Sequence, residues 1–145
     1  MFLGEYLHAF DDKSRLTIPA KFRDELARGC VVTRGFEKHL IIYTSEAFSD
    51  LIKKAQTMSP TDPDGRALQR LIFSGASEAT PDKTGRVLIP PFLRAYADLE
   101  GEVYIIGVGQ NIEVWSKAGW EEQLKSMNDP EANSRRFAAL NLAMG

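Results

Sequence analysis

The residue types that build most enzyme and metal sites are scarce in this sequence. Cys30 is the single cysteine, so the chain cannot form an intrachain disulfide or a cysteine-rich zinc site. It lies on an apolar stretch without a nearby basic activator, which favours a small core residue over a nucleophile. The histidines, His8 and His39, have no fixed spacing to carboxylates, and a glycine-rich phosphate loop and a nucleophile elbow are missing. We therefore expect no catalytic residue, no metal, no cofactor and no small-molecule substrate.

The sequence also lacks a strong charge of either sign and any long hydrophobic run. It has 18 Lys and Arg against 20 Asp and Glu, a net charge of −2, so overall charge does not indicate a nucleic-acid binder. Residues 1–40 hold seven basic against six acidic side chains, so a basic patch would have to arise from folding or assembly. The apolar runs are too short for a membrane span or a signal peptide. We expect a cytoplasmic protein without membrane contact.

One short motif occurs twice, and the rest of the chain is organised around it. Residues 11–19 read DDKSRLTIP and residues 82–90 read DKTGRVLIP, so Asp11 and Asp82 correspond at an offset of 71. Each copy is a polar turn with Asp, Lys and Arg, followed by an apolar strand. A proline then begins a helix, where its missing N–H costs nothing. The two copies predict the same local structure in both halves of the chain.

The repeat extends beyond this motif. Residues 40–44 correspond to 112–116 at an offset of 72, and Arg70-Leu71 to Arg136-Phe137 at an offset of 66. A period near 70 residues is too long for a solenoid, so two halves about a pseudo-two-fold axis are expected. The boundaries are units at 5–48 and 76–119, connecting helices and linker at 49–75, and C-terminal helices at 120–145. The fold class is α+β and rich in strands.

Local patterns predict the elements of each half. The turn at 11–14 should join the first strand to residues 15–18 as a hairpin, and 30–33 with 39–43 should form a second hairpin. Ser45 is a candidate cap for the following helix. Residues 59–65 resemble a linker, and residues 133–144 should form the last helix with Met144 on its apolar stripe.

These features resemble the MraZ family of bacterial transcriptional regulators. The resemblance rests on the opening MFLG, the paired Asp-x-x-x-Arg turns, the two Ile-Pro steps and RLIFSGA at residues 70–76. It implies two AbrB-like swapped-hairpin units per chain, which share a small β-barrel with flanking helices. It also implies a cytoplasmic, nucleoid-associated protein that binds double-stranded DNA at short direct repeats. Those repeats would lie upstream of the division and cell-wall gene cluster, including its own gene, and the protein would form a homo-oligomeric ring.

One position departs from the family pattern. The first turn has Ser14 where the family usually has Gly, whereas the second turn keeps Gly85. Serine disfavours a positive φ without forbidding the turn, so the sequence leaves the shape of the first turn open.

The cations of the two turns are the candidate DNA ligands. Arginine can grip phosphate or the O6/N7 edge of guanine, and lysines beside it can add phosphate contacts. The candidates are Arg15, Arg86, Lys13 and Lys83. Aspartate repels phosphate, so Asp11 and Asp82 are expected to shape the turns together with Gly85.

Other interpretations stay open. The Asp–Arg pairs could be surface ion pairs that close a turn. Arg23 and Arg94, one turn into the short helices, could bind DNA, lie at an interface or be solvated. Trp115 and Trp120 correspond to Tyr43 and Phe48, which favours core packing. An alternative function is an AbrB-fold protein-interaction module, antitoxin-like or a structural ring, without specific DNA binding.

Overall fold

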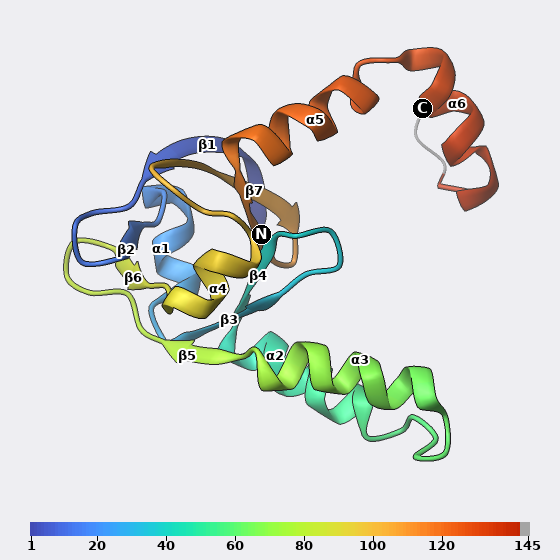
Figure 1. Cartoon of the computed structure of the whole chain (residues 1–145), viewed down its shortest axis with the longest axis horizontal. Coiled ribbons are helices and arrows are strands. Elements are labelled where there is room, and N and C mark those ends of the chain that lie inside the picture. The colour runs from blue at the N-terminus through green and yellow to red at the C-terminus, as the bar shows by residue number, and fades with distance from the viewer. Residues whose placement is uncertain (143–145) are drawn as a thin grey trace.

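The computed structural model describes residues 1–142 as a β-rich α+β structure with helices projecting on one side (Figure 1). The first half contains β1 (Phe2–Ala9), β2 (Arg15–Thr17), α1 (Ala20–Leu26), β3 (Cys30–Arg34), β4 (Leu40–Thr44), α2 (Ser45–Ala55) and α3 (Pro63–Ser74). The second half contains β5 (Ser77–Ala79), β6 (Arg86–Leu88), α4 (Pro91–Tyr96), β7 (Glu102–Gly109), β8 (Ile112–Ser116), α5 (Lys117–Met127), α6 (Pro130–Phe137) and the short 3-10 helix η1 (Ala138–Leu140). The two halves therefore repeat the same order of elements, as the duplicated motif predicts.

Six strands form one antiparallel sheet in the order β1-β7-β8-β4-β3-β5. The hairpins β3–β4 and β7–β8 confirm the sequence patterns, and they join through β4 and β8, where Leu40 faces Val114. The order is symmetric about this join. The approximate two-fold axis that relates the halves therefore passes between β4 and β8.

The halves exchange their first strands. β1 of the first half pairs with β7 of the second over its whole length, and β5 of the second half pairs with β3 of the first. β2 likewise pairs with β6. The predicted hairpin between the first strand and residues 15–18 is thus reduced to a single bridge, Phe10 to Leu16. β2 pairs instead with β6 of the other half, over Arg15–Thr17 and Arg86–Leu88.

The prediction of a closed small barrel is wrong, because the six-stranded sheet is open. β1 and β5 are its two edges, and within residues 1–142 they do not pair with each other. β2 and β6 form a separate two-stranded ribbon. Closure would need a continuous ladder from β1 to β5, and the strands of the ribbon pair with each other and with neither edge strand.

The main core lies between the sheet, the ribbon and the short helices. Leu16, Ile18 and Phe22 of the first half pack with Val87 and Ile89 of the second, all with 1% or less of their surface exposed. Full burial of such side chains contributes about 1.5–3 kcal/mol each. The core therefore fixes the ribbon against the rest of the molecule and needs both halves.

Two smaller clusters hold the longer helices, and they confirm the expected packing of the tryptophans. Trp115 and Trp120 pack with Ile106 beneath α5. Phe48 packs with Ile72 where α2 and α3 cover the sheet. Cys30 is fully buried, as its apolar strand predicts.

Several helix boundaries differ from the predicted ones. Thr44, not Ser45, caps α2 by accepting the N–H of Ala47 at 3.0 Å. α3 begins inside the predicted linker, at Pro63, because Asp62 caps it. The last helix, α6, begins at Pro130 rather than residue 133 for the same reason, since the Asp129 carboxylate accepts N–H groups of its first turn.

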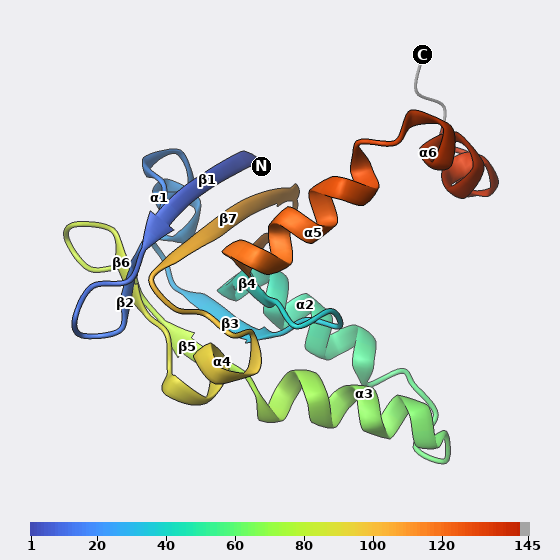
Figure 2. The same cartoon turned by 45° about the horizontal axis from the view of Figure 1, so that its top comes forward.

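The two C-terminal regions of the halves are arranged differently. α3 folds back along α2, whereas α6 lies at the far end of α5, away from the sheet (Figure 2). α6 ends at Phe137, and Met144 of the predicted stripe lies outside the described residues. None of the helices within residues 1–142 is long and apolar enough to cross a membrane.

Candidate nucleic-acid interface

The two polar turns lie side by side at one end of the molecule, because β2 pairs with β6 (Figure 1). Backbone hydrogen bonds join each turn to the opposite strand end. The Ile18 N–H donates to the Gly85 carbonyl at 2.8 Å, and the Ile89 N–H donates to the Ser14 carbonyl at 3.1 Å. The structure thus brings Arg15 and the residues around Arg86 onto one surface.

Asp11 organises the first turn. Its Oδ1 accepts the backbone N–H groups of Lys13 and Arg15, each at 2.9 Å, and its Oδ2 accepts Arg15 Nε at 2.7 Å. These hydrogen bonds, led by that from the Arg15 backbone, lower the pKa of Asp11 below its ordinary value. The carboxylate stays ionised at neutral pH and holds both the turn backbone and the arginine.

Asp82 does the same in the second turn. Its Oδ1 accepts the N–H groups of Thr84 and Arg86, at 3.0 and 2.9 Å, and its Oδ2 accepts Arg86 Nε at 2.9 Å. The hydrogen bond from the Arg86 backbone is the largest cause that lowers the pKa of Asp82 to about 2. Each aspartate thus accepts hydrogen bonds from the backbone of its own turn and from the side chain of its own arginine.

Ser14 and Gly85 adopt the same left-handed conformation, with φ of 62° and 78°. The structure therefore answers the question that the sequence left open, because Ser14 takes the same conformation as Gly85. The hydrogen bonds to Asp11 hold Ser14 in a conformation that costs a non-glycine residue about 1–2 kcal/mol.

Arg15 and Arg86 keep part of their guanidinium groups available. Their side chains are 28% and 32% exposed. Each is held through Nε, and Arg86 Nη1 also lies 3.6 Å from the Asp11 carboxylate. Among residues 1–142, no ion pair or hydrogen bond engages the Nη atoms of Arg15. The ion pairs considered from the sequence do exist, and they orient the arginines without covering them.

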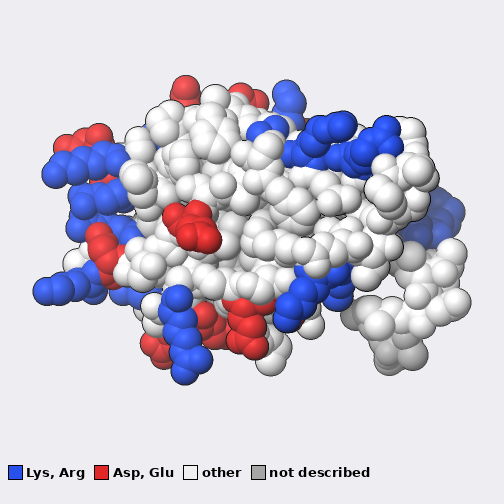
Figure 3. Space-filling model, turned by 90° about the horizontal axis from the view of Figure 1, so that it is seen from below, with Lys and Arg blue, Asp and Glu red and all other residues white. Residues whose placement is uncertain are grey.

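Lys13 and Lys83 are exposed beside these arginines. In the described part of the chain, neither ammonium group forms an ion pair. Basic side chains project at the turn-bearing end of the molecule, with acidic ones among them (Figure 3). The lysines can therefore contribute charge to a bound polyanion.

Sequence reasoning missed two residues of this surface, Thr17 and Leu88. In the register of the β2–β6 ribbon, Arg15 lies opposite Leu88 and Thr17 lies opposite Arg86. Leu16 is buried on the other face of the ribbon. Leu88 is 56% exposed. The alternation of side chains along a strand was the signal that could have found both residues.

Arg23 and Arg94 flank the ribbon from the two short helices. Arg23 Nε donates to the Ile18 carbonyl at 2.9 Å, and Arg94 Nη1 donates to Ser14 Oγ at 2.8 Å. Both residues are only half-exposed. They lie next to the turns, and each donates at least one hydrogen bond within the protein.

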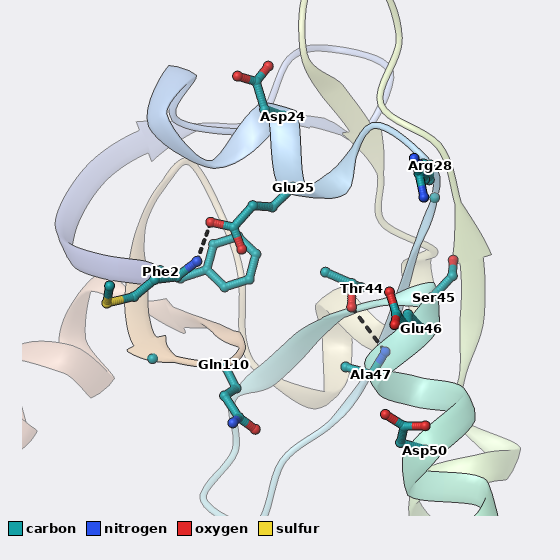
Figure 4. A pocket seen from close by; sticks show the side chains of 13 residues that line it. Phe2, Asp24, Glu25, Arg28, Thr44, Ser45, Glu46, Ala47, Asp50 and Gln110 are labelled. Carbon is teal, nitrogen blue, oxygen red and sulfur yellow. Dashed lines mark hydrogen bonds and ion pairs between the residues drawn. The ribbon is translucent and has the colours of Figure 1, made fainter.

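A large concavity lies elsewhere and is acidic. It has a volume of about 960 Å³ and lies between β1, α1 and the start of α2 (Figure 4). Its lining includes Asp24, Glu25, Glu46 and Asp50, and the N-terminal ammonium contacts Glu25. Four carboxylates repel phosphate, so this concavity is not a nucleic-acid site.

Comparison with known proteins places this arrangement in a family. The family described as "MraZ protein, putative antitoxin-like" matches the chain twice, at residues 1–71 and 72–140. Transcriptional regulator MraZ of Moorella thermoacetica is 43% identical over 129 residues, which cover 89% of this chain and 90% of that protein. Transcriptional regulator MraZ of Acetivibrio thermocellus is 43% identical over 143 residues, covering 98% of this chain and 100% of that protein. The chain, with its two repeated halves and paired arginine turns, belongs to the MraZ family.

Proposed function

We propose that this protein is a transcriptional regulator that binds DNA through the outer face of the β2–β6 ribbon. The observation that carries the proposal is the pairing of two identical Asp–Arg turns on one surface, with Arg15 and Arg86 both oriented by a carboxylate. The names of the curated relatives, transcriptional regulators, support the same function. The unit boundaries at 5–48 and 76–119, and their AbrB-like swapped-hairpin identity, stay predictions.

The ribbon has the shape that such binding requires. The major groove of B-DNA admits a two-stranded β-ribbon. The outward side chains of the ribbon are Arg15, Thr17, Arg86 and Leu88. Arginine can read guanine and an apolar side chain can contact the thymine methyl group, while Lys13 and Lys83 reach the phosphates. The specific target we propose is a set of short direct repeats upstream of the division and cell-wall gene cluster, including the protein's own gene.

We also propose that the protein acts as a homo-oligomeric ring on the nucleoid. An apolar groove of about 330 Å³ is lined by residues of β4, α2 and α3 together with Phe36. The α6 and η1 segment has no buried residue and exposes Phe137 and Leu140. Both features support contacts between copies. A protomer of net charge −2 gains from such assembly, because several ribbons can bind one DNA together.

The test is a titration of the DNA upstream of this protein's own gene against a scrambled duplex, at two salt concentrations. We expect tighter binding to the upstream DNA and an affinity that falls steeply with salt. Arg15→Ala and Arg86→Ala should each lose about 1–3 kcal/mol of binding, the value of a bidentate guanine contact. Both variants should stay folded, since Asp11 and Asp82 still accept the turn N–H groups.

Lys125→Ala is the matched control, because Lys125 pairs with Glu122 on α5, which projects away from the ribbon. It should bind as the wild type does. If both ribbon arginines can be removed without loss of affinity, the ribbon is not the DNA-binding surface.

The alternative, a protein-interaction module without specific DNA binding, is favoured by the apolar groove and the net charge. It predicts equal affinity for the upstream and scrambled duplexes. The same titration therefore separates the two functions.

A further inference from the structure

Arg23 and Arg94 occupy the same position in the two short helices, and each lies against the turn of the other half. Arg94, in the second half, donates to Ser14 of the first turn. Arg23, in the first half, lies against Gly85 of the second turn, whose added Cβ would come 2.1 Å from Arg23 Nε. The contacts are crossed in both directions. Each turn therefore has a support that its own half does not provide.

The contacts of Arg94 fix the first turn from behind. Besides the 2.8 Å hydrogen bond to Ser14 Oγ, its Nη2 lies 3.5 Å from the Leu99 carbonyl oxygen. Its guanidinium carbon lies 4.1 Å from the centre of the Phe10 ring, within range of a cation–π interaction. Phe10 immediately precedes the turn, so Arg94 contacts both the approach to the turn and its left-handed residue.

Arg23 supports the second turn through the backbone of one residue, Ile18. The Ile18 carbonyl accepts from Arg23 Nε at 2.9 Å, and the Ile18 N–H donates to the Gly85 carbonyl at 2.8 Å. Arg23, Ile18 and Gly85 thus form one connected unit. Ile18 is fully buried, which makes this unit rigid.

We propose that Arg23 and Arg94 are positioning residues, each holding the DNA-binding turn of the opposite half, and are not themselves DNA ligands. Arg23 Nε donates to the Ile18 carbonyl, Arg94 Nη1 donates to Ser14 Oγ, and both side chains are half-buried. A turn held in one conformation presents its arginine to DNA without an ordering cost on binding. The consequence for DNA affinity rests on the proposed function, whereas the support of the turns does not.

The first test needs no DNA. Amide hydrogen exchange of the full-length protein reports the N–H groups that Asp11 and Asp82 accept. Arg94→Ala should speed exchange about tenfold at Lys13 and Arg15 and leave Thr84 unchanged, since a hydrogen bond to a charged group is lost beside the first turn only. Arg23→Ala should speed exchange at Thr84 and Arg86 and leave Lys13 unchanged. Faster exchange in the turn of the same half as the substitution, or unchanged exchange in both turns, would contradict the crossed support.

Two variants control this experiment. Arg28→Ala removes an exposed arginine that lines the acidic concavity, away from the ribbon, and should change exchange in neither turn. Ser14→Ala removes only the acceptor of Arg94 and keeps the same left-handed strain. It should reproduce the effect of Arg94→Ala at Lys13, even if Arg94→Ala disturbs the fold more widely.

The second test separates a positioning residue from a phosphate ligand. Loss of a phosphate contact lowers the slope of log affinity against log salt by about 1. Lys13→Ala should show this lower slope. Arg94→Ala should weaken binding with the wild-type slope. A reduced slope for Arg94→Ala together with unchanged exchange would show that Arg94 contacts DNA directly.

Discussion

At the scale of single residues, the turns depend on which oxygen of each aspartate binds which group. Oδ1 of Asp11 and of Asp82 accepts backbone N–H groups, and Oδ2 accepts the Nε of the neighbouring arginine. One carboxylate therefore shapes the turn and orients the arginine with separate atoms. An amide in its place could shape the turn through its oxygen, but it could not orient the arginine, because its nitrogen donates rather than accepts.

The separate roles of the two carboxylate oxygens predict the effect of Asp82→Asn. The turn should persist, because the asparagine oxygen can still accept from Thr84 and Arg86. Arg86 should lose its orientation, so DNA affinity should fall by less than in Arg86→Ala. The measurement is fluorescence anisotropy with the upstream DNA, alongside hydrogen exchange at Thr84. Equal losses for the two variants would mean that the aspartate and arginine act as one unit.

Substitutions at the two left-handed positions should change stability by different amounts. In Gly85→Ala, a Cβ would come 2.1 Å from Arg23 Nε at a φ of 78°, so both a clash and backbone strain arise. We expect about 1–3 kcal/mol of destabilisation, measured by urea unfolding. Ser14→Gly relieves strain while losing the hydrogen bond to Arg94, so its change in unfolding free energy should be much smaller. Equal destabilisation by both substitutions would contradict this comparison.

At the scale of elements, local patterns predicted the parts that depend on neighbours in sequence. Alternation and β-forming residues identified both hairpins, and Pro19 and Pro90 marked the start of the short helices. The pairing of β1 with β7 was not predictable, because any exposed strand edge can accept any partner. Thr44 and Ser45 are both good caps, so their order alone did not identify the cap of α2.

The contact of His39 with β8 should make the stability of the fold sensitive to mild acid. His39 is buried, stacks on Trp115 with ring centres 4.5 Å apart, and lies 3.5 Å from the Glu113 carboxylate on β8. Burial lowers the pKa of His39 below 6.5, outweighing the opposite effect of Glu113 and Glu37. Folding therefore favours neutral His39. The stability this provides is complete above pH 6.5 and is lost as pH falls toward the folded-state pKa.

We expect His39→Gln to remove this acid sensitivity. Between pH 7 and pH 5 the urea midpoint of the wild type should fall more than that of His39→Gln, which carries no charge at either pH. Glu113→Gln should lose more stability on acidification than the wild type, because the carboxylate that favours protonated His39 is gone. Identical pH dependence in all three proteins would show that His39 does not set the acid limit.

At the scale of the whole molecule, the proposed ring links binding to the spacing of DNA sites. A single protomer offers one ribbon with few cations. Several ribbons on one assembly turn later contacts into intramolecular ones, which can raise avidity by about 10²–10⁴ when the spacing fits. The apolar groove and the exposed α6 segment are the surfaces that would support the assembly.

Affinity should therefore rise steeply with the number of direct repeats on the probe. Repeats about 10–10.5 bp apart lie on one face of the duplex. An insertion of roughly half a helical turn between repeats should lower affinity, because it rotates the next site away. Anisotropy with probes of one to four repeats measures both effects. Equal affinity for one repeat and four would exclude multivalent binding.

The exchange of first strands also bears on how the chain emerges from the ribosome. β7 is translated about a hundred residues after its partner β1. At about 5–20 residues per second, β1 waits on the order of 5–20 s before its ladder can form. During that interval Phe2 cannot reach its buried place in the core, and the nascent first half holds an unpaired strand. A chain truncated before β7 should therefore bind chaperones rather than fold.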